Sequence, residues 1–125
     1  MTTIPNDIRI AIESAREKKA EGVALLDLRK LGAFTEYFLI CTGFSSPQIA
    51  AIADNIEEKL AQSGRRRVRL EGNPKSSEWV LLDFGYFVVH IFTERARLFY
   101  DLERLWRAAP RTDFSAPPPG MARAR

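Results

Sequence analysis

The feature that most constrains the fold is the segment Trp79–Phe92, which reads WVLLDFGYFVVHIF. β-branched and aromatic residues favour strands, and Gly85 can adopt the positive φ that a tight turn requires. The segment therefore predicts a hairpin with antiparallel strands over about residues 79–83 and 86–92. Because both strands are apolar on both faces, we expect the hairpin to lie centrally in a sheet, covered by helices or by a partner.

The rest of the chain alternates between helical and strand patterns. Apolar residues recur at helical spacing in residues 5–20, 46–63 and 93–107. Short apolar runs indicate strands at residues 23–28, 37–42 and, more weakly, 68–70. The order α-β-β-α-β-β-β-α predicts an α/β fold with a mixed sheet of about five strands flanked by helices.

The signals at the ends of the middle helix are specific. Ser46 before Pro47 suits an N-cap followed by a first-turn proline, and Ser45 with Gln48 is an alternative capping box. Gly64 is placed to end the helix as the residue after its C-cap.

The length of 125 residues indicates one domain, over residues 1–107. Residues 108–125 are rich in proline, alanine and arginine, cannot build a core, and are predicted to form a disordered tail. No apolar run approaches the roughly 20 residues needed to span a bilayer, and no signal peptide is recognised at the N-terminus. With Cys41 as the single cysteine, no internal disulfide can form, which fits a reducing cytoplasm.

The charge distribution argues against a general nucleic-acid-binding domain. Four of the 19 basic residues and one of the 16 acidic residues fall in residues 107–125, which leaves 15 of each for residues 1–106. The basic excess therefore lies in the tail, whereas binding to a phosphate backbone usually requires a basic face on the domain. The run Arg65, Arg66, Arg67 is interpreted as a solvated end to the middle helix, with contact to ribosomal RNA as the alternative.

Catalysis finds little support in the sequence. The corner Gly43–Ser46 resembles that of nucleotidyltransferases, but Asp27 and Asp83 each lack the second carboxylate that holds catalytic metal ions. His90 in an apolar strand, without a serine elbow, is better read as a hydrogen-bonded sheet residue or an interface contact than as a general base. Cys41 is interpreted as a core residue, so no catalytic, metal or cofactor site is predicted.

The aromatic residues of the last third of the chain exceed what a core of this size needs. They are Trp79, Phe84, Tyr86, Phe87, Phe92, Phe99, Tyr100 and Trp106. Tryptophan and tyrosine dominate protein–protein hot spots, so some of these residues are predicted to form a binding patch.

Several of these motifs, in this order, resemble the ribosomal silencing factor (RsfS, or Iojap-like) family over about residues 8–107. The matching segments are Leu25–Leu28, Tyr37–Gly43, Ser45–Asp54, Glu71–Gly72, Trp79–Gly85, Val88–Phe92, Arg97 and Phe99–Trp106. The resemblance implies a nucleotidyltransferase-like fold without enzyme activity. It also implies binding to large-subunit ribosomal protein uL14 on the face that meets the small subunit, which blocks subunit joining and represses translation when nutrients are scarce.

Carried over by position, the resemblance assigns a partner-binding surface. Its residues are Trp79, Leu81, Asp83, His90, Phe92, Tyr100 and Trp106. The polar Asp83 and His90 are expected to provide hydrogen bonds that fix orientation within an apolar patch. The sequence departs from the family pattern at Tyr86, where an acid is common, and at Glu36, where Asp is usual. An exposed apolar patch also predicts a homodimer in the free protein, and an RNA-contacting assembly factor of the large subunit is the alternative function.

Overall fold

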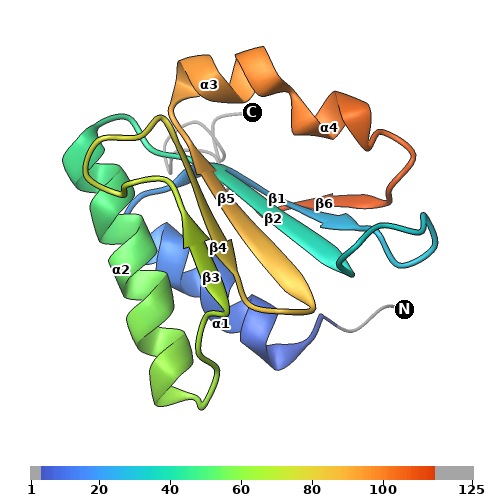
Figure 1. Ribbon diagram of the computed structural model, residues 1–125, viewed down its shortest axis with the longest axis horizontal. Coiled ribbons are helices and arrows are strands. Elements are labelled where there is room, and N and C mark those ends of the chain that lie inside the picture. Colours follow the sequence, from blue (N-terminus) through green and yellow to red (C-terminus); the bar gives the residue numbers. More distant parts are fainter. Residues whose placement is uncertain (1–3, 115–125) are drawn as a thin grey trace, which may run out of the picture.

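The computed structural model describes residues 4–114 and contains a six-stranded mixed sheet with helices on both faces (Figure 1). The strands are β1 (Glu21–Asp27), β2 (Tyr37–Thr42), β3 (Arg69–Glu71), β4 (Trp79–Asp83), β5 (Phe87–Phe92) and β6 (Arg111–Asp113). The helices are α1 (Asn6–Glu17), α2 (Ser46–Gln62), α3 (Glu94–Tyr100) and α4 (Leu102–Leu105). The predicted α/β fold with a mixed sheet is confirmed.

The strand order is β3-β4-β5-β2-β1-β6, so the predicted hairpin β4–β5 contributes the central strand β5. β5 pairs in parallel with β2, from Tyr37 opposite Phe87 to Thr42 opposite Phe92. All other neighbouring strands are antiparallel. Every residue of β2 and β5 is buried, because these two strands are covered on both faces of the sheet.

Two separate hydrophobic cores lie on the two faces of the sheet. One core packs α1 and α2 against residues such as Leu39, Val89 and Ile91. The other packs Ala96 of α3, with the half-buried Leu102 and Trp106, against the opposite face. In Figure 1, α1 and α2 accordingly lie on one side of the strands, while α3 and α4 cross the other. The second core is smaller, so the face under α3 and α4 is the less completely covered one.

Hydrogen bonds at the N-terminus of α2 show which of the two predicted residues is the N-cap. The Ser45 hydroxyl accepts a hydrogen bond from the Gln48 backbone N–H at 3.1 Å, and the Gln48 side-chain oxygen accepts one from the Phe44 N–H at 2.6 Å. Ser45 is therefore the N-cap, in a reciprocal capping arrangement. At the other end Gly64 has a φ of 93°, as expected after a C-cap.

The C-terminal region differs from the prediction in two ways. The last helix is broken at Asp101, which separates α3 from α4. Residues 111–113, predicted to belong to a disordered tail, form β6 on the edge of the sheet, paired with β1. The sheet therefore has six strands instead of about five, and the domain extends at least to residue 114. The remaining predicted tail, residues 115–125, lies outside the described residues.

No helix within residues 4–114 is long and apolar enough to cross a membrane.

Candidate interaction surface

The seven residues predicted to bind a partner lie on the same side of the sheet, five of them on β4 and β5 and two, Tyr100 and Trp106, in the α3–α4 region. We call this set, Trp79, Leu81, Asp83, His90, Phe92, Tyr100 and Trp106, the aromatic face. Along β4 the burial alternates, so that Val80 and Leu82 are buried in the α1–α2 core and the residues between them point to the opposite face. Cross-strand pairing of Trp79 with Phe92 and of Leu81 with His90 places the β5 members on the same face.

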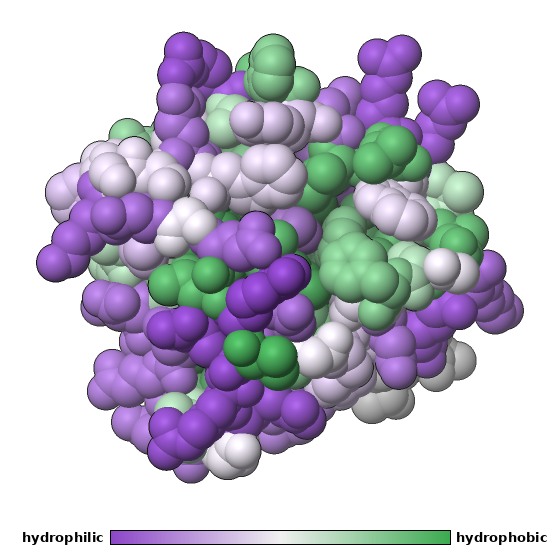
Figure 2. All heavy atoms as spheres, in the orientation of Figure 1, coloured by the Kyte–Doolittle hydropathy of each residue, from purple (hydrophilic) through white to green (hydrophobic). Residues whose placement is uncertain are grey.

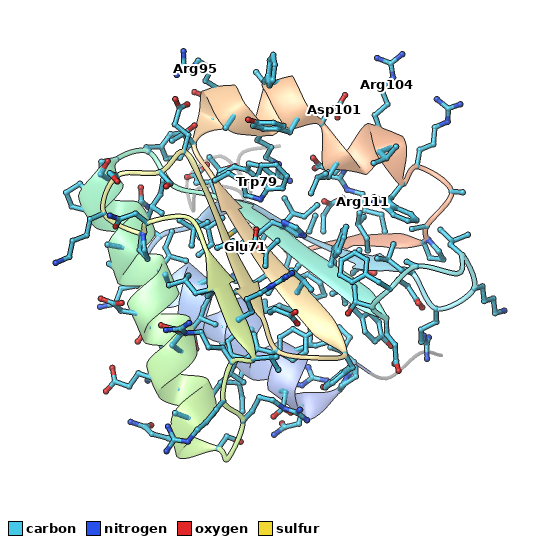
Figure 3. The ribbon with its side chains drawn as sticks, in the orientation of Figure 1. Glu71, Trp79, Arg95, Asp101, Arg104 and Arg111 are labelled. Atoms are coloured by element: carbon cyan, nitrogen blue, oxygen red, sulfur yellow. The ribbon has the colours of Figure 1, made fainter. Side chains whose placement is uncertain are left out.

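An aromatic stack joins β4 and β5 to α3. The Trp79 ring lies 5.0 Å from the Phe92 ring and 4.6 Å from the Tyr100 ring, measured between centroids. Tyr100 is 49% exposed and Trp79 is half-buried, whereas Phe92 is buried. Figure 3 shows Trp79 between the sheet and α3. The stack therefore presents two partly open aromatic side chains, held in place by a buried one.

His90 is buried beneath this stack and is neutral. The Trp79 indole N–H donates to His90 Nδ1 at 3.1 Å, so the proton of the neutral imidazole lies on Nε2. His90 is only 2% exposed, and its removal from water lowers its pKa from 6.5 to about 3. Within the described residues Nε2 has no hydrogen-bond partner. His90 thus orients Trp79 from below and is not itself available to a partner on the surface.

Trp106, the last member of the aromatic face, packs on a residue of β2 outside the predicted set. Trp106, beyond α4, packs edge-on against Phe38 of β2, with ring centroids 6.1 Å apart. Phe38 in turn lies 4.4 Å from the His90 ring. The prediction did not include Phe38, because a strand buried on both faces gives no sequence signal of which residues meet the last helix.

Asp83 has a local role in the structure. Its carboxylate oxygen Oδ1 accepts a hydrogen bond from the Gly85 N–H at 2.8 Å, which stabilises the turn of the β4–β5 hairpin. Gly85 has a φ of 97°, as the sequence predicted for this turn. One of the two carboxylate oxygens is therefore used within the chain, at the end of the face most distant along β4 from Trp79.

An exposed apolar surface lies next to the aromatic face and includes Phe99, one of the surplus aromatic residues. The sequence predicted one continuous helix over residues 93–107. Leu98 on α3 and Leu105 on α4 are 77% and 73% exposed. Phe99 is also 77% exposed. We call Leu98, Phe99 and Leu105 the outer α3–α4 surface; Figure 2 shows hydrophobic side chains in the upper region that α3 and α4 occupy.

The residues considered for catalysis occupy structural positions. Cys41 is fully buried, and burial raises the pKa of its thiol to about 12. Hydrogen bonds from Arg29 occupy both carboxylate oxygens of Asp27 and hold the pKa of that carboxyl below its usual value. Residues 4–114 contain no group of three or more His, Cys, Asp or Glu side chains arranged to hold a metal ion.

Comparison with known proteins identifies the family. A family model described as "Ribosomal silencing factor during starvation" matches residues 1–125. The chain belongs to the ribosomal silencing factor family. Ribosomal silencing factor RsfS of Bacillus subtilis is 38% identical over 106 residues, which are 85% of this chain and 89% of that protein. The chloroplastic protein Iojap of Zea mays is 38% identical over 96 residues, which are 75% of this chain and 40% of that protein.

The fold is shared with solved structures of similar sequence. A crystal structure of a protein from Chromobacterium violaceum has a TM-score of 0.79 and 35% identity, and the match covers 85% of this chain and 88% of that one. As a ribosomal silencing factor family member, the chain has a role in regulating translation or the ribosome and belongs with regulatory proteins, not with enzymes.

The arginine run at residues 65–67 does not form an open nucleic-acid-binding site. Arg65 Nε bonds to Asp7 Oδ2 at 2.9 Å, and its guanidinium lies 5.1 Å from the centre of the Tyr86 ring. Arg67 forms an ion pair with Glu57 on α2. Arg66 is exposed. Two of the three arginines therefore already have carboxylate partners within the chain, and Tyr86 serves as a packing surface for Arg65.

Proposed function

We propose that this chain binds the large ribosomal subunit through ribosomal protein uL14 and blocks the joining of the small subunit by steric occlusion. Translation is thereby repressed in the cytoplasm under nutrient limitation, without catalysis or a cofactor. Membership in a family described by ribosomal silencing during starvation supports this proposal. The partly open members of the aromatic face would contact the ribosomal protein.

The observation that carries the assignment is the partly open Trp79–Tyr100 stack. Trp79 is fixed by a hydrogen bond below and by stacking on both sides, so little side-chain entropy is lost when a partner covers it. Preorganised tryptophan and tyrosine side chains are typical of interface hot spots. The adjoining outer α3–α4 surface extends the apolar area that a partner can cover.

The test is co-sedimentation of the purified chain with large ribosomal subunits, with small subunits added to the same samples. We expect the chain to be retained on the large subunit and the amount of joined ribosomes to fall. Retention without a block on joining would favour the assembly-factor alternative. A chain that is not retained would contradict the proposal.

The contact residues are tested with Trp79→Ala. A hot-spot truncation costs about 2 kcal/mol or more, so we expect affinity for the large subunit to fall roughly 30-fold. Val68→Ala is the control, because Val68 is 73% exposed and belongs to neither core. His90→Ala is unsuitable, since removing a buried ring would destabilise the fold as well. Unchanged binding by a folded Trp79→Ala protein would refute the site.

We also propose that the free chain is a homodimer in which the outer α3–α4 surface is covered by a second copy. Three large apolar side chains, each more than 70% exposed, support this proposal. Light scattering coupled to gel filtration measures the mass directly. Phe99→Ser should shift the dimer to monomer; a wild-type chain that is monomeric at micromolar concentration would contradict the proposal.

A further inference from the structure

The relative placement of α3 and α4 is not set by the backbone alone. Asp101 between them has left-handed angles, with φ of 47° and ψ of 55°, which ends the regular hydrogen-bonding pattern of α3. α4 has four residues and none of them is buried. A helix of four residues is not stable alone, so its position depends on side chains: Leu102 and Trp106 pack on the sheet, and further side chains connect α4 to α3 at the junction. Figure 3 shows Asp101 at this junction.

The side chains that fix the junction are Arg97 on α3 and Glu103 on α4. Arg97 Nη2 donates to Glu103 Oε2 at 2.6 Å, and Arg97 Nε donates to Glu103 Oε1 at 3.4 Å. The two side chains are 13% and 16% exposed, in contrast to most ion pairs of this chain. A fork, in which two guanidinium nitrogens bond to the two oxygens of one carboxylate, restrains both the distance and the relative orientation of the two side chains. An ammonium group, as a single point charge, does not restrain their orientation.

The same guanidinium is anchored to the sheet. Arg97 Nη1 donates to the Thr42 hydroxyl of β2 at 3.0 Å. It also lies against Gly22 of β1, where a Cβ atom would come within 2.5 Å of Nη1. Gly22 has a φ of 58°, a conformation that glycine adopts without strain. The strand therefore leaves room for the guanidinium where a larger residue would push it away.

Glu103 connects this group to the edge of the sheet. Arg111 of β6 lies 3.3 Å from Glu103 Oε2 and bonds to Asp113 at 3.0 Å. In Figure 3, Arg111 lies between β6 and α4. One carboxylate thus links α4 to α3 and, through the two arginines, to β2 and β6.

The link lies beside both aromatic residues that the C-terminal helices contribute to the aromatic face. Tyr100 is three residues after Arg97, and Trp106 is three residues after Glu103, so each aromatic residue is a near neighbour of one member of the pair. Tyr100 stacks on Trp79, and Trp106 packs on Phe38. The Arg97–Glu103 fork therefore connects the two segments that carry these aromatic side chains.

We propose that Arg97 and Glu103 are positioning residues for ribosome binding: their ion pair sets α4 relative to α3 and so holds Tyr100 and Trp106 at the spacing that the partner recognises. The inference rests on the proposed function, since the aromatic face must be the docking surface. Because both side chains are largely buried, they act through Tyr100 and Trp106 and not by touching the partner.

The test compares Glu103→Gln with Glu17→Gln in large-subunit binding, at a temperature where circular dichroism shows both variants folded. Glu17 also contacts a cationic and a polar side chain, Lys59 and Asn55, on the α1–α2 side of the sheet, although its side chain is 54% exposed. We expect Glu103→Gln to lose affinity about tenfold, which corresponds to about 1.4 kcal/mol, and Glu17→Gln to bind like the wild type. Arg97→Lys, which keeps the charge and loses the fork, should also bind more weakly.

A second readout separates positioning from general stability. The chain has two tryptophans, Trp79 and Trp106, so the two indole N–H signals in a nitrogen–proton correlation spectrum report on the aromatic face. In folded Glu103→Gln the Trp106 signal should move, while Glu17→Gln should leave it unchanged. Glu103→Gln with a lower unfolding midpoint but wild-type affinity and an unmoved Trp106 signal would overturn the inference. A wild-type chain that does not bind at all would instead refute the proposed function.

Discussion

The single histidine of the chain makes a quantitative prediction about stability in mild acid. Burial lowers the pKa of His90 from 6.5 to about 3, so the native protein keeps this side chain neutral where the unfolded chain is protonated. The unfolded state therefore binds one more proton between these two pH values. His90 costs no stability above pH 6.5, and the free energy of unfolding falls as the pH falls from 6.5 toward about 3.

The size of the effect follows from the pH interval. Each pH unit below the unfolded pKa removes about 1.4 kcal/mol, so lowering the pH from about 7.5 to about 5.0 should cost about 2 kcal/mol through His90 alone. That is a large part of the 5–15 kcal/mol that typically stabilises a domain. Carboxylates contribute little in this interval, because their unfolded pKa values lie near or below its lower end.

The assay is urea unfolding at half-unit steps from pH 7.5 to 5.0, for the wild type and for His90→Gln. The wild type should lose stability along this series, and the variant, which has no imidazole, should be nearly flat. Equal slopes for the two proteins would refute the reasoning. As an independent check, the imidazole proton signals of the native protein should not titrate over the same range; a midpoint near 6.5 would place His90 in water.

Three further predictions concern single positions. Gly22→Ala should lower the free energy of unfolding by about 1 kcal/mol or more in urea titrations, because a Cβ atom meets the Arg97 guanidinium and φ is positive. Ser45→Ala should cost about 1 kcal/mol by the same measurement, since the Gln48 N–H loses its side-chain acceptor; an unchanged value would mean that another group caps α2. Cys41 should not react with a thiol reagent at pH 8 in the native protein and should react fully in urea, because it is buried and its pKa is raised to about 12; rapid native labelling would contradict its burial.

Most of the sheet could be predicted because its strands carry strong local signals. The bounds of β2 and β4 match the predicted residues 37–42 and 79–83, where apolar runs are long and flanked by turn residues. β6 gave no such signal, since all three of its residues are exposed and polar. β6 forms because the edge of β1 that does not pair with β2 is open to a further strand. That edge exists only once the sheet has assembled, so the local sequence does not indicate it.

The members of the candidate site were proposed from the sequence and the family resemblance, but their geometry could not be. His90 stood out as a polar residue in an apolar strand, yet only the β4–β5 register places it under Trp79 to accept the indole hydrogen bond. The break at Asp101 was missed because aspartate tolerates the left-handed conformation without a glycine to mark it. Arg65 and Arg67 were read from their neighbours in sequence, whereas their carboxylate partners come from α1 and α2.

The strand order also bears on how the molecule is made. Within the sheet, β1 and β2 form one antiparallel pair, and β3, β4 and β5 form a second antiparallel unit. The two units are joined by the parallel pairing of β2 with β5, in which Tyr37 lies opposite Phe87. Pairing between strands that are distant in sequence forms slowly, because closing the intervening loop costs entropy before the pairing contacts can form. During synthesis β2 can therefore pair with its parallel neighbour only after β5 has been made. β1 can pair with β6 only later, because β6 follows β5 in the sequence. A nascent chain therefore completes its aromatic face only after Trp106 has been synthesised, and its six-stranded sheet only after Asp113 has been synthesised.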